Sequence, residues 1–505
     1  MSLVRRNVVA NIAGSGWSLL MSLGFVPVYL HFLGIEAYGL IGIFLALVAI
    51  LSLLDLGLGT TLNRELSRLS VQTGSAQQMR DLLRTLEIVY WMIGLLVGLV
   101  LVGLAPIIAV HWVKAQQLPQ DSVERAFVIM GVAIACQWPL TLYSGGLSGL
   151  QRQVMLNSLS VVMVTVRNVG AAAVLWQVSS TIEAFLAWQV AVSLVQTLVT
   201  GVALWRSLPP GTMFAGFKPR LLHEVWRFAA GMTGISVMAV ILTQLDKVIL
   251  SKVLSLEAFG YYSLAGRVAA GLYYLVGPVS AAFFPRFSQL ATLDDQGELA
   301  RLYHRSCQLM SVMVLPAAVI LAVFPAEFLL LWTTDAAIAA NTSTMLALLV
   351  IGTAINGLMN LPLALQLAHG WTRLVFAINT VAVIVLAPLI YFASLRYGGV
   401  GAAWVWIILN CGYVIFLLQM MHRRLLPGHL REWFLVDVGK PLAAALAVGG
   451  LWRLAWAIPV HYGWALLSLA AVALLTTLAA AFAAPQIREM IVRRLWTRVR
   501  QKAGS

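Results

Sequence analysis

Residues 91–110 read WMIGLLVGLVLVGLAPIIAV, an unbroken run without a charged side chain. A helix of about 20 apolar residues crosses the hydrocarbon core of a bilayer. Such runs recur along the whole chain of 505 residues, of which 61% are hydrophobic. We expect about fourteen of them, near residues 10–32, 37–61, 87–112, 126–149, 154–176, 182–205, 227–250, 258–287, 306–331, 343–368, 373–394, 399–421, 438–457 and 463–484. The sequence therefore predicts an all-α polytopic membrane protein without room for a soluble domain.

Membrane topology explains the net charge of +14 better than nucleic-acid binding does. Cytosolic loops of membrane proteins carry an excess of Lys and Arg. If the N-terminus is cytosolic, most of the 33 Lys and Arg residues lie in cytosolic loops or in the C-terminal tail. Both termini are then cytosolic, and the basic loops anchor the chain to anionic lipids. The three cysteines stand singly without zinc-type Cys/His spacing, so we expect neither a disulfide nor a metal site.

An internal repeat is visible at an offset of 221 residues. EAYG at 36–39 opens the second predicted span, and EAFG at 257–260 opens the eighth. Arg64 and Arg286 close these two spans at nearly the same offset. Because an even number of spans separates the copies, the halves have parallel orientation. We predict one six-helix bundle at 1–206, a second at 207–425, and two extra helices with a basic tail at 426–505.

Matching stripes of small polar residues run along one face of the first and seventh predicted spans. The residues are Asn11, Ser15 and Ser22 in the first stripe and Thr233, Ser236 and Thr243 in the second. Hydrogen bonding between helices explains either stripe alone. Two stripes at repeat-related positions favour a water-filled cavity shared by the halves.

Three cations, Arg167, Lys247 and Arg267, lie inside predicted spans. A cation at this depth costs a few kcal/mol and normally faces a cavity, a counter-charge or an anionic ligand. The buried carboxylates that we expect near them are Asp55 and Asp246. One interpretation is structural: ion pairing with Asp246, and for Lys247 extension to the interface. The other is an anion site, because arginine presents a fork of donors suited to phosphate oxygens.

Asp55 and the pair Gly277-Pro278 are candidates for gating or moving parts. Asp55 either neutralises Arg64 or belongs to an inner gate or a protonatable coupling site. Pro278 lacks a backbone N–H inside the eighth span, which makes the pair a candidate hinge. No nucleotide-hydrolysing loop, zinc-protease motif or hydrolase elbow is present, so we expect no catalytic residue.

The chain resembles the polysaccharide transporter family, the O-antigen (Wzx-type) lipid-linked oligosaccharide flippases of the multidrug/oligosaccharidyl-lipid/polysaccharide exporter superfamily. The resemblance rests on the segment from Asn7 to Pro27, GIEAYG at 34–39, LLDLGLG at 53–59, and QLDK at 244–247 followed by EAFG. It implies two six-helix bundles facing each other in a V, with an extra helix pair that offers a groove for a polyprenyl tail. It also implies a cationic cavity for pyrophosphate and sugars, which the three interior cations suit.

The resemblance implies a flippase that moves an undecaprenyl-diphosphate-linked glycan unit from the cytosolic to the outer leaflet by alternating access. Its location is then the bacterial inner membrane, with other polysaccharide-assembly membrane proteins as conceivable partners. No cofactor is expected, and the sequence leaves open whether a proton or sodium ion drives transport. A cation-coupled multidrug antiporter of the same superfamily is the alternative, although it needs buried carboxylates and the first span has none. A polyprenyl-linked glycan polymerase or ligase would need a large outer loop, which the sequence does not predict.

Overall fold

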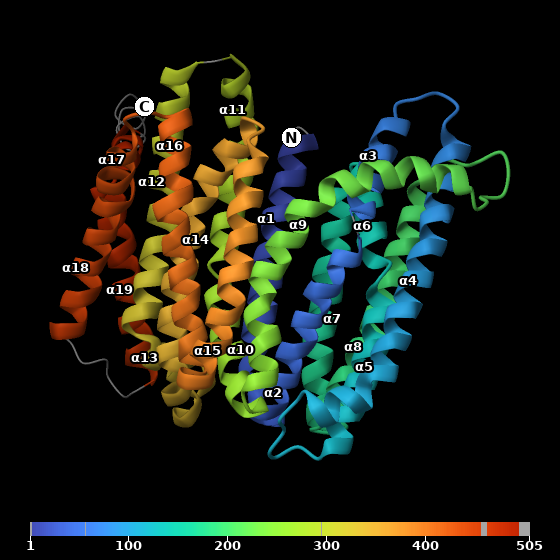
Figure 1. Ribbon diagram of the computed structural model, residues 1–505, viewed down its shortest axis with the longest axis horizontal. Coiled ribbons are helices and arrows are strands. Elements are labelled where there is room, and N and C mark those ends of the chain that lie inside the picture. The colour runs from blue at the N-terminus through green and yellow to red at the C-terminus, as the bar shows by residue number, and fades with distance from the viewer. Residues whose placement is uncertain (1–2, 56, 294, 456–461, 494–505) are drawn as a thin grey trace, which may run out of the picture. The chain divides into compact units, whose positions relative to one another are not determined.

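The computed structural model describes the backbone of residues 3–55, 57–293, 295–455 and 462–493 (Figure 1). It describes the side chains of all of these except 3–10, 12, 223–236, 239 and 462. The regular elements in the described residues are all helical. Eleven of the described helices are long and apolar enough to cross a membrane. The prediction of an all-α polytopic membrane protein is therefore confirmed, while the count of fourteen stays a prediction.

The first of two compact units comprises Met1–Gly260. Its helices are α1 (Leu3–Gly24), α2 (Val26–Leu51), the short η1 (Ser52–Asp55), α3 (Leu58–Leu69), α4 (Ala76–His111), α5 (Gln120–Gln137), α6 (Leu140–Gly149), α7 (Gln153–Gln177), α8 (Ile182–Ser207) and α9 (Pro219–Val253). Within this unit α4 packs on α5, α5 on α8, α7 on both α1 and α8, and α2 on α9. Large apolar side chains such as Tyr90, Phe127 and Leu40 fill the space between these helices.

The second compact unit comprises Tyr261–Ser505. It contains most of α10 (Leu256–Ala270), then α11 (Tyr273–Leu293), α12 (Gln296–Val323), α13 (Pro325–Thr333), α14 (Ala336–Ala368), α15 (Thr372–Gly412), the π-helix η2 (Tyr413–Leu418), α16 (Gln419–Leu425), α17 (Leu430–Glu432), the π-helix η3 (Trp433–Gly439), α18 (Lys440–Ala455) and α19 (Tyr462–Ala483). α14 packs against α11, α12 and α15. α18 and α19 pair with each other and lie against α12 (Figure 1). The predicted division at residues 206 and 425 stays a prediction.

Two glycines mark sharp turns within stretches that otherwise read as single helices. Gly34 inside α2 has φ 75° and Gly398 inside α15 has φ 58°. Such positive φ values suit glycine because it has no Cβ. Both turns fall between spans that the sequence separates, at 32–37 and 394–399. The predicted span boundaries therefore agree with the backbone at these two points.

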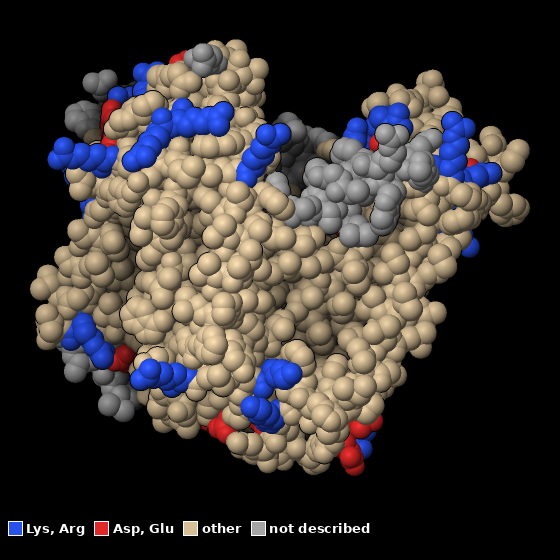
Figure 2. Space-filling view, viewed as in Figure 1, with Lys and Arg blue, Asp and Glu red and all other residues tan. Residues whose placement is uncertain are grey.

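Basic side chains gather at one end of the helices in each unit. Figure 2 shows them near α3 and the start of α4 in the first unit and near α16 in the second, with further Lys and Arg side chains at the opposite end and few charged side chains between. On the 36-residue helix α4, Arg80 and Arg84 lie at this end, and Lys114 follows the opposite end. At 1.5 Å per residue the helix spans about 54 Å, enough to cross the bilayer and its headgroup regions.

Candidate functional site

The two copies of the repeated motif pack directly on each other within the first unit. A Cβ placed on Gly39 would lie 2.6 Å from the backbone oxygen of Leu256. At the repeat-related position, a Cβ on Gly260 would meet the backbone oxygen of Ile35 even more closely. The contact is reciprocal, because Ile35 and Leu256 are themselves 221 residues apart, as are the two glycines. The final glycine of each motif is thus the residue that lets the two chain segments approach.

Glu36, from the first copy of the motif, holds an interhelix loop in place. Its side chain is only 3% exposed, and its carboxylate accepts backbone N–H groups of Gln116, Gln117 and Leu118 at 2.5, 2.8 and 3.0 Å. Three N–H donors are enough to stabilise a buried carboxylate without a cation. Glu36 therefore fixes the loop that follows α4.

The same loop joins the second copy of the motif. The backbone oxygen of Lys114 accepts the N–H of Leu256 at 2.9 Å, and its Nζ donates to the oxygen of Val253 at 2.9 Å. Trp112 donates its indole N–H to Ser251 at 3.0 Å. One loop after α4 is therefore bonded both to Glu36 and to the segment that leads into α10.

Arg167 lies on α7 and binds a row of neutral oxygens on α8. Its guanidinium donates to Gln189 Oε1 at 2.8 Å, Ser193 Oγ at 3.3 Å and Gln196 Oε1 at 2.9 Å. These acceptors recur every three or four residues and so share one helix face. In the described part of the chain no carboxylate pairs with Arg167, so its positive charge is solvated but not neutralised. The sequence alone did not reveal these partners.

Lys247 and Arg267 have different surroundings. Lys247 Nζ contacts Asp246 Oδ1 at 3.2 Å and donates to the backbone oxygen of Thr243 at 2.7 Å, so the structural interpretation describes its local contacts. Arg267 is half-buried near the end of α10, and no hydrogen bond or ion pair joins it to another described residue. Arg167 and Lys247 belong to the first unit, and Arg267 to the second.

The polar stripe of the first span serves partly to join α1 to α7. Asn157 Nδ2 donates to Asn11 Oδ1 at 2.5 Å. Ser22 donates to the backbone oxygen of Leu19 at 3.2 Å, and Ser15 is exposed. In the matching stripe, the side chains of Thr233 and Ser236 lie outside the described residues, while Thr243 Oγ1 donates to the oxygen of Val240 at 3.2 Å. The shared cavity stays a prediction.

Asp55 is bonded to hydroxyl groups. Tyr90 donates its hydroxyl to Asp55 Oδ1, and Thr141 Oγ1 lies 3.4 Å from the same atom. Arg64 is exposed on α3, beyond the turn at Gly57, which has φ 75°. Among the described residues, the hydrogen bonds that the Asp55 carboxylate accepts come from neutral hydroxyl groups, and a gating or coupling role for Asp55 stays a prediction.

The remaining gate and hinge candidates lie on α11. Arg286 is exposed and donates to Gln289 at 3.0 Å. Gly277 and Pro278 lie inside α11, whereas the helical stretch itself is interrupted earlier, between α10 and α11 at residues 271–272. A hinge at Gly277-Pro278 stays a prediction.

The expectation that Asp55 and Asp246 supply the buried carboxylates was incomplete. Asp55 and Asp246 are half-buried, whereas Glu36, Glu87 and Asp437 are buried in the described residues. Each has donors of its own: Glu36 the backbone N–H groups, Glu87 its neighbour Arg84 at 2.9 Å, and Asp437 the side chain of Gln308 at 3.0 Å. The added negative charge therefore does not neutralise the three candidate cations.

A second polar network, missed in the sequence, crosses α11, α14 and α15. Tyr273 donates its hydroxyl to Asn356 Oδ1 at 3.0 Å, and Asn356 donates to Asn410 Oδ1 at 2.8 Å. Three residues after Asn410, Tyr413 donates its hydroxyl to Asn379 Oδ1 at 2.8 Å. The asparagines inside these apolar spans could have indicated the network from the sequence, because a buried side-chain amide needs hydrogen-bond partners on neighbouring helices.

Comparison with known proteins places this arrangement in a family. Residues 31–339 match the family model described as "Polysaccharide biosynthesis protein". A Shigella flexneri protein named "Putative O-antigen transporter" is 22% identical over 429 residues, covering 84% of this chain and 99% of that protein.

Solved transporter structures share the fold. A chain described as "Lipid II flippase MurJ, inward closed conformation" aligns with a TM-score of 0.72 and 13% identity over 96% of this chain and 99% of its own. An inward-facing multidrug resistance MATE family transporter of the MOP superfamily aligns with a TM-score of 0.60 and 12% identity, over 84% and 96%. The match across 31–339 covers more than half of the sequence, so the chain belongs to the polysaccharide biosynthesis protein family.

Proposed function

We propose that this protein is a flippase that moves an undecaprenyl-diphosphate-linked glycan unit from the cytosolic to the outer leaflet of a bacterial inner membrane. The basic helix ends then face the cytosol, in line with the usual bias of Lys and Arg. Fourteen spans, two bundles arranged in a V and alternating access are parts of the same proposal. The energy source is left open between an ion gradient and the membrane potential.

The observation that carries the proposal is the charge of Arg167. A guanidinium on a membrane-spanning helix, surrounded by Gln189, Ser193 and Gln196, keeps its full positive charge and its affinity for anions. A diphosphate offers oxygens that match the guanidinium fork. Arg267 and Lys247 are proposed as further members of the cationic cavity, and Asp55, Arg64 and Arg286 as gate residues.

The family and the fold support the same assignment. The Shigella relative is named for O-antigen transport, and the MurJ structure for flipping lipid II. A cation-coupled multidrug antiporter remains the second candidate, because MATE transporters share the fold. An antiporter of that kind binds cationic drugs, and an un-neutralised Arg167 would repel them. The sign of the interior charge therefore favours the flippase.

The test is translocation in proteoliposomes. The purified full-length chain is reconstituted with a fluorescent undecaprenyl-diphosphate-linked oligosaccharide, and transfer between leaflets is measured beside uptake of a cationic dye. Arg167→Gln is expected to slow glycan-lipid transfer at least tenfold, whereas Arg167→Lys keeps the charge and loses less. Arg125→Gln, on an exposed arginine, is the matched control.

Two results would overturn the proposal. The first is dye transport without glycan-lipid transfer, which would favour the antiporter. The second is normal transfer by correctly inserted Arg167→Gln protein, which would make the arginine a purely structural link between α7 and α8.

A further inference from the structure

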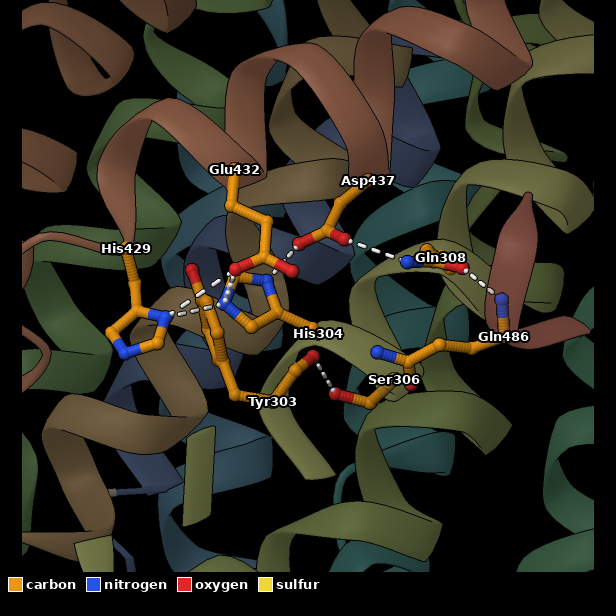
Figure 3. A network of polar contacts seen from close by, with 8 residues as sticks. All are labelled: Tyr303, His304, Ser306, Gln308, His429, Glu432, Asp437 and Gln486. Carbon is orange, nitrogen blue, oxygen red and sulfur yellow. Dashed lines mark hydrogen bonds and ion pairs between the residues drawn. The ribbon is translucent and has the colours of Figure 1, made fainter. Parts of the chain in front are cut away.

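A compact cluster of titratable side chains lies where the last helix pair joins α12 (Figure 3). His304 on α12 is 3% exposed, and its Nε2 lies 2.9 Å from His429 Nδ1 and 3.2 Å from Glu432 Oε2. His429 Nδ1 and Glu432 Oε2 are 3.5 Å apart. Three potential ligand atoms thus converge from two segments that are more than 120 residues apart in sequence.

The chain builds this cluster with a turn and a π-helix. After α16, Gly428 takes φ 86°. His429 then caps the N-terminus of the short α17, and Glu432, three residues later, ends it. The π-helix η3 follows and carries Asp437, which is fully buried. π-helical turns are frequent at functional sites. The local backbone therefore turns these side chains toward α12.

Asp437 orients His304. Its Oδ2 lies 2.5 Å from His304 Nδ1, and its Oδ1 accepts the amide of Gln308 at 3.0 Å. Gln308 is held in turn by the backbone N–H of Gln486 at 2.9 Å. A carboxylate bonded to Nδ1 of histidine keeps the proton on that nitrogen, which leaves Nε2 with a free lone pair. Metal-binding histidines have this same second partner.

The lone pair of His304 Nε2 faces another acceptor. Glu432 Oε2, 3.2 Å away, is acceptor-only when ionised. His429 Nδ1 can donate one proton, either to His304 Nε2 or to Glu432 Oε2. Two electron-rich atoms at this separation need a cation between them, either an additional proton or a metal ion.

The separations of the three atoms match a metal site. Zinc binds nitrogen and oxygen ligands at about 2.0–2.1 Å in tetrahedral geometry, which puts neighbouring ligand atoms about 3.3 Å apart. The observed separations of 2.9, 3.2 and 3.5 Å are close to that value. The side chains of His429 and Glu432 are 36% and 44% exposed, so a fourth position can be filled by water.

One more buried polar atom nearby, Nε2 of His422, makes no hydrogen bond to another described residue. The Tyr303 ring lies 5.5 Å from the rings of both His304 and His422, and Figure 3 shows it alongside His304 on the side of His429. A buried polar atom without a hydrogen bond is uncommon in folded proteins.

We propose that His304 Nε2, His429 Nδ1 and Glu432 Oε2 bind one divalent transition-metal ion of the zinc type, with Asp437 positioning His304. The ion would tie the segment that begins the α18–α19 pair to α12. This site is independent of the proposed transport function. It was not expected from the sequence, because the ligands show no spacing that signals a metal.

The test uses the full-length chain, purified with a tag that contains no histidine. After treatment with a chelator, the protein is equilibrated with Zn²⁺, dialysed and analysed for metal by mass spectrometry. One zinc per chain is expected. His429→Ala and Glu432→Gln, which change partly exposed side chains, should lose it, and His111→Ala, on an exposed histidine of α4, should keep it.

Asp437→Asn is expected to weaken zinc affinity 10–100-fold without removing a ligand. Co²⁺ provides a second readout, because tetrahedral cobalt has intense visible absorption that octahedral cobalt lacks. If the native chain retains no stoichiometric zinc, the cluster is an imidazolium–carboxylate network only and the proposal is wrong. Equal zinc retention by His429→Ala would overturn it as well.

Discussion

Adding one methyl group at Gly39 or Gly260 should push the two copies of the repeated motif apart. At Gly39 the new Cβ would lie 2.6 Å from the Leu256 oxygen and 3.0 Å from its Cδ1. Ordinary contact begins at 3.4 Å, so the backbones would have to separate by about 0.8 Å. The obstacle is a backbone atom, which cannot rotate away as a side chain can.

The magnitude follows from two opposing effects. Overpacking of a close contact costs about 1–3 kcal/mol, and because the obstacle here is a backbone atom we place the cost in the upper part of that range, about 2–3 kcal/mol. Replacing a helical glycine with alanine returns about 1 kcal/mol through helix propensity. The net penalty of about 1–2 kcal/mol falls only on conformations in which the motifs touch, which changes their population about 5- to 30-fold.

The assay measures access to the motif contact. In a chain whose three cysteines are replaced, a cysteine is placed at buried Ala37, and its reaction with a membrane-impermeant maleimide is followed. Gly39→Ala and Gly260→Ala should each accelerate labelling about 5- to 30-fold. Together they should have less than the summed effect, because the first separation relieves part of the second.

Gly266→Ala is the matched control. Gly266 lies on α10, six residues from Gly260, and an added Cβ there would meet nothing within 4 Å. This variant should label like the parent. Unchanged labelling in both motif variants, or equal acceleration by the control, would refute the argument that the reciprocal glycines hold this contact.

Further substitutions separate buried charge contacts from exposed ones, each measured as thermal unfolding of the purified protein. Glu36→Gln should destabilise by about 1.5–3 kcal/mol, because the buried carboxylate loses at least one of its charge-assisted bonds to backbone N–H groups; an unchanged midpoint would contradict this. Tyr90→Phe should destabilise comparably by removing the hydroxyl that binds Asp55, and a stabilised variant would count against the bond. Glu327→Gln, which breaks the partly exposed pair with Arg453, should cost less than about 1 kcal/mol, and a larger loss would show that the pair is shielded from water.

The sequence predicted the all-α membrane class of this fold because apolar run length and the thickness of the bilayer determine it almost alone. Turns at Gly34 and Gly398 fell where two predicted spans meet, and the repeat seen in 36–39 and 257–260 became a reciprocal contact. Contacts across helices were harder, because they depend on the rotation of each helix about its axis. Hydropathy does not determine that rotation within membrane spans, where most faces are apolar.

The candidate site illustrates this limit. Arg167 was recognisable from its depth in a span, but its acceptors on α8 follow it by 22 to 29 residues and carry no motif. Glu36 stood inside a recognised motif, yet its partners are backbone N–H groups, which any sequence provides. His304 and His429 are 125 residues apart, so only the packing of α17 near α12 relates them.

The hydrogen-bond inventory of Arg167 makes it the strongest of the three candidate cations. A guanidinium has five N–H donors, and the described residues accept three hydrogen bonds from it. Lys247, by comparison, already contacts the carboxylate of Asp246 at 3.2 Å. Arg167 combines an un-neutralised charge with N–H groups left for another acceptor, the two properties that binding of a diphosphate requires. A glycan-lipid that bound elsewhere would leave those donors to water, and Arg167→Gln would then cost stability without slowing transport.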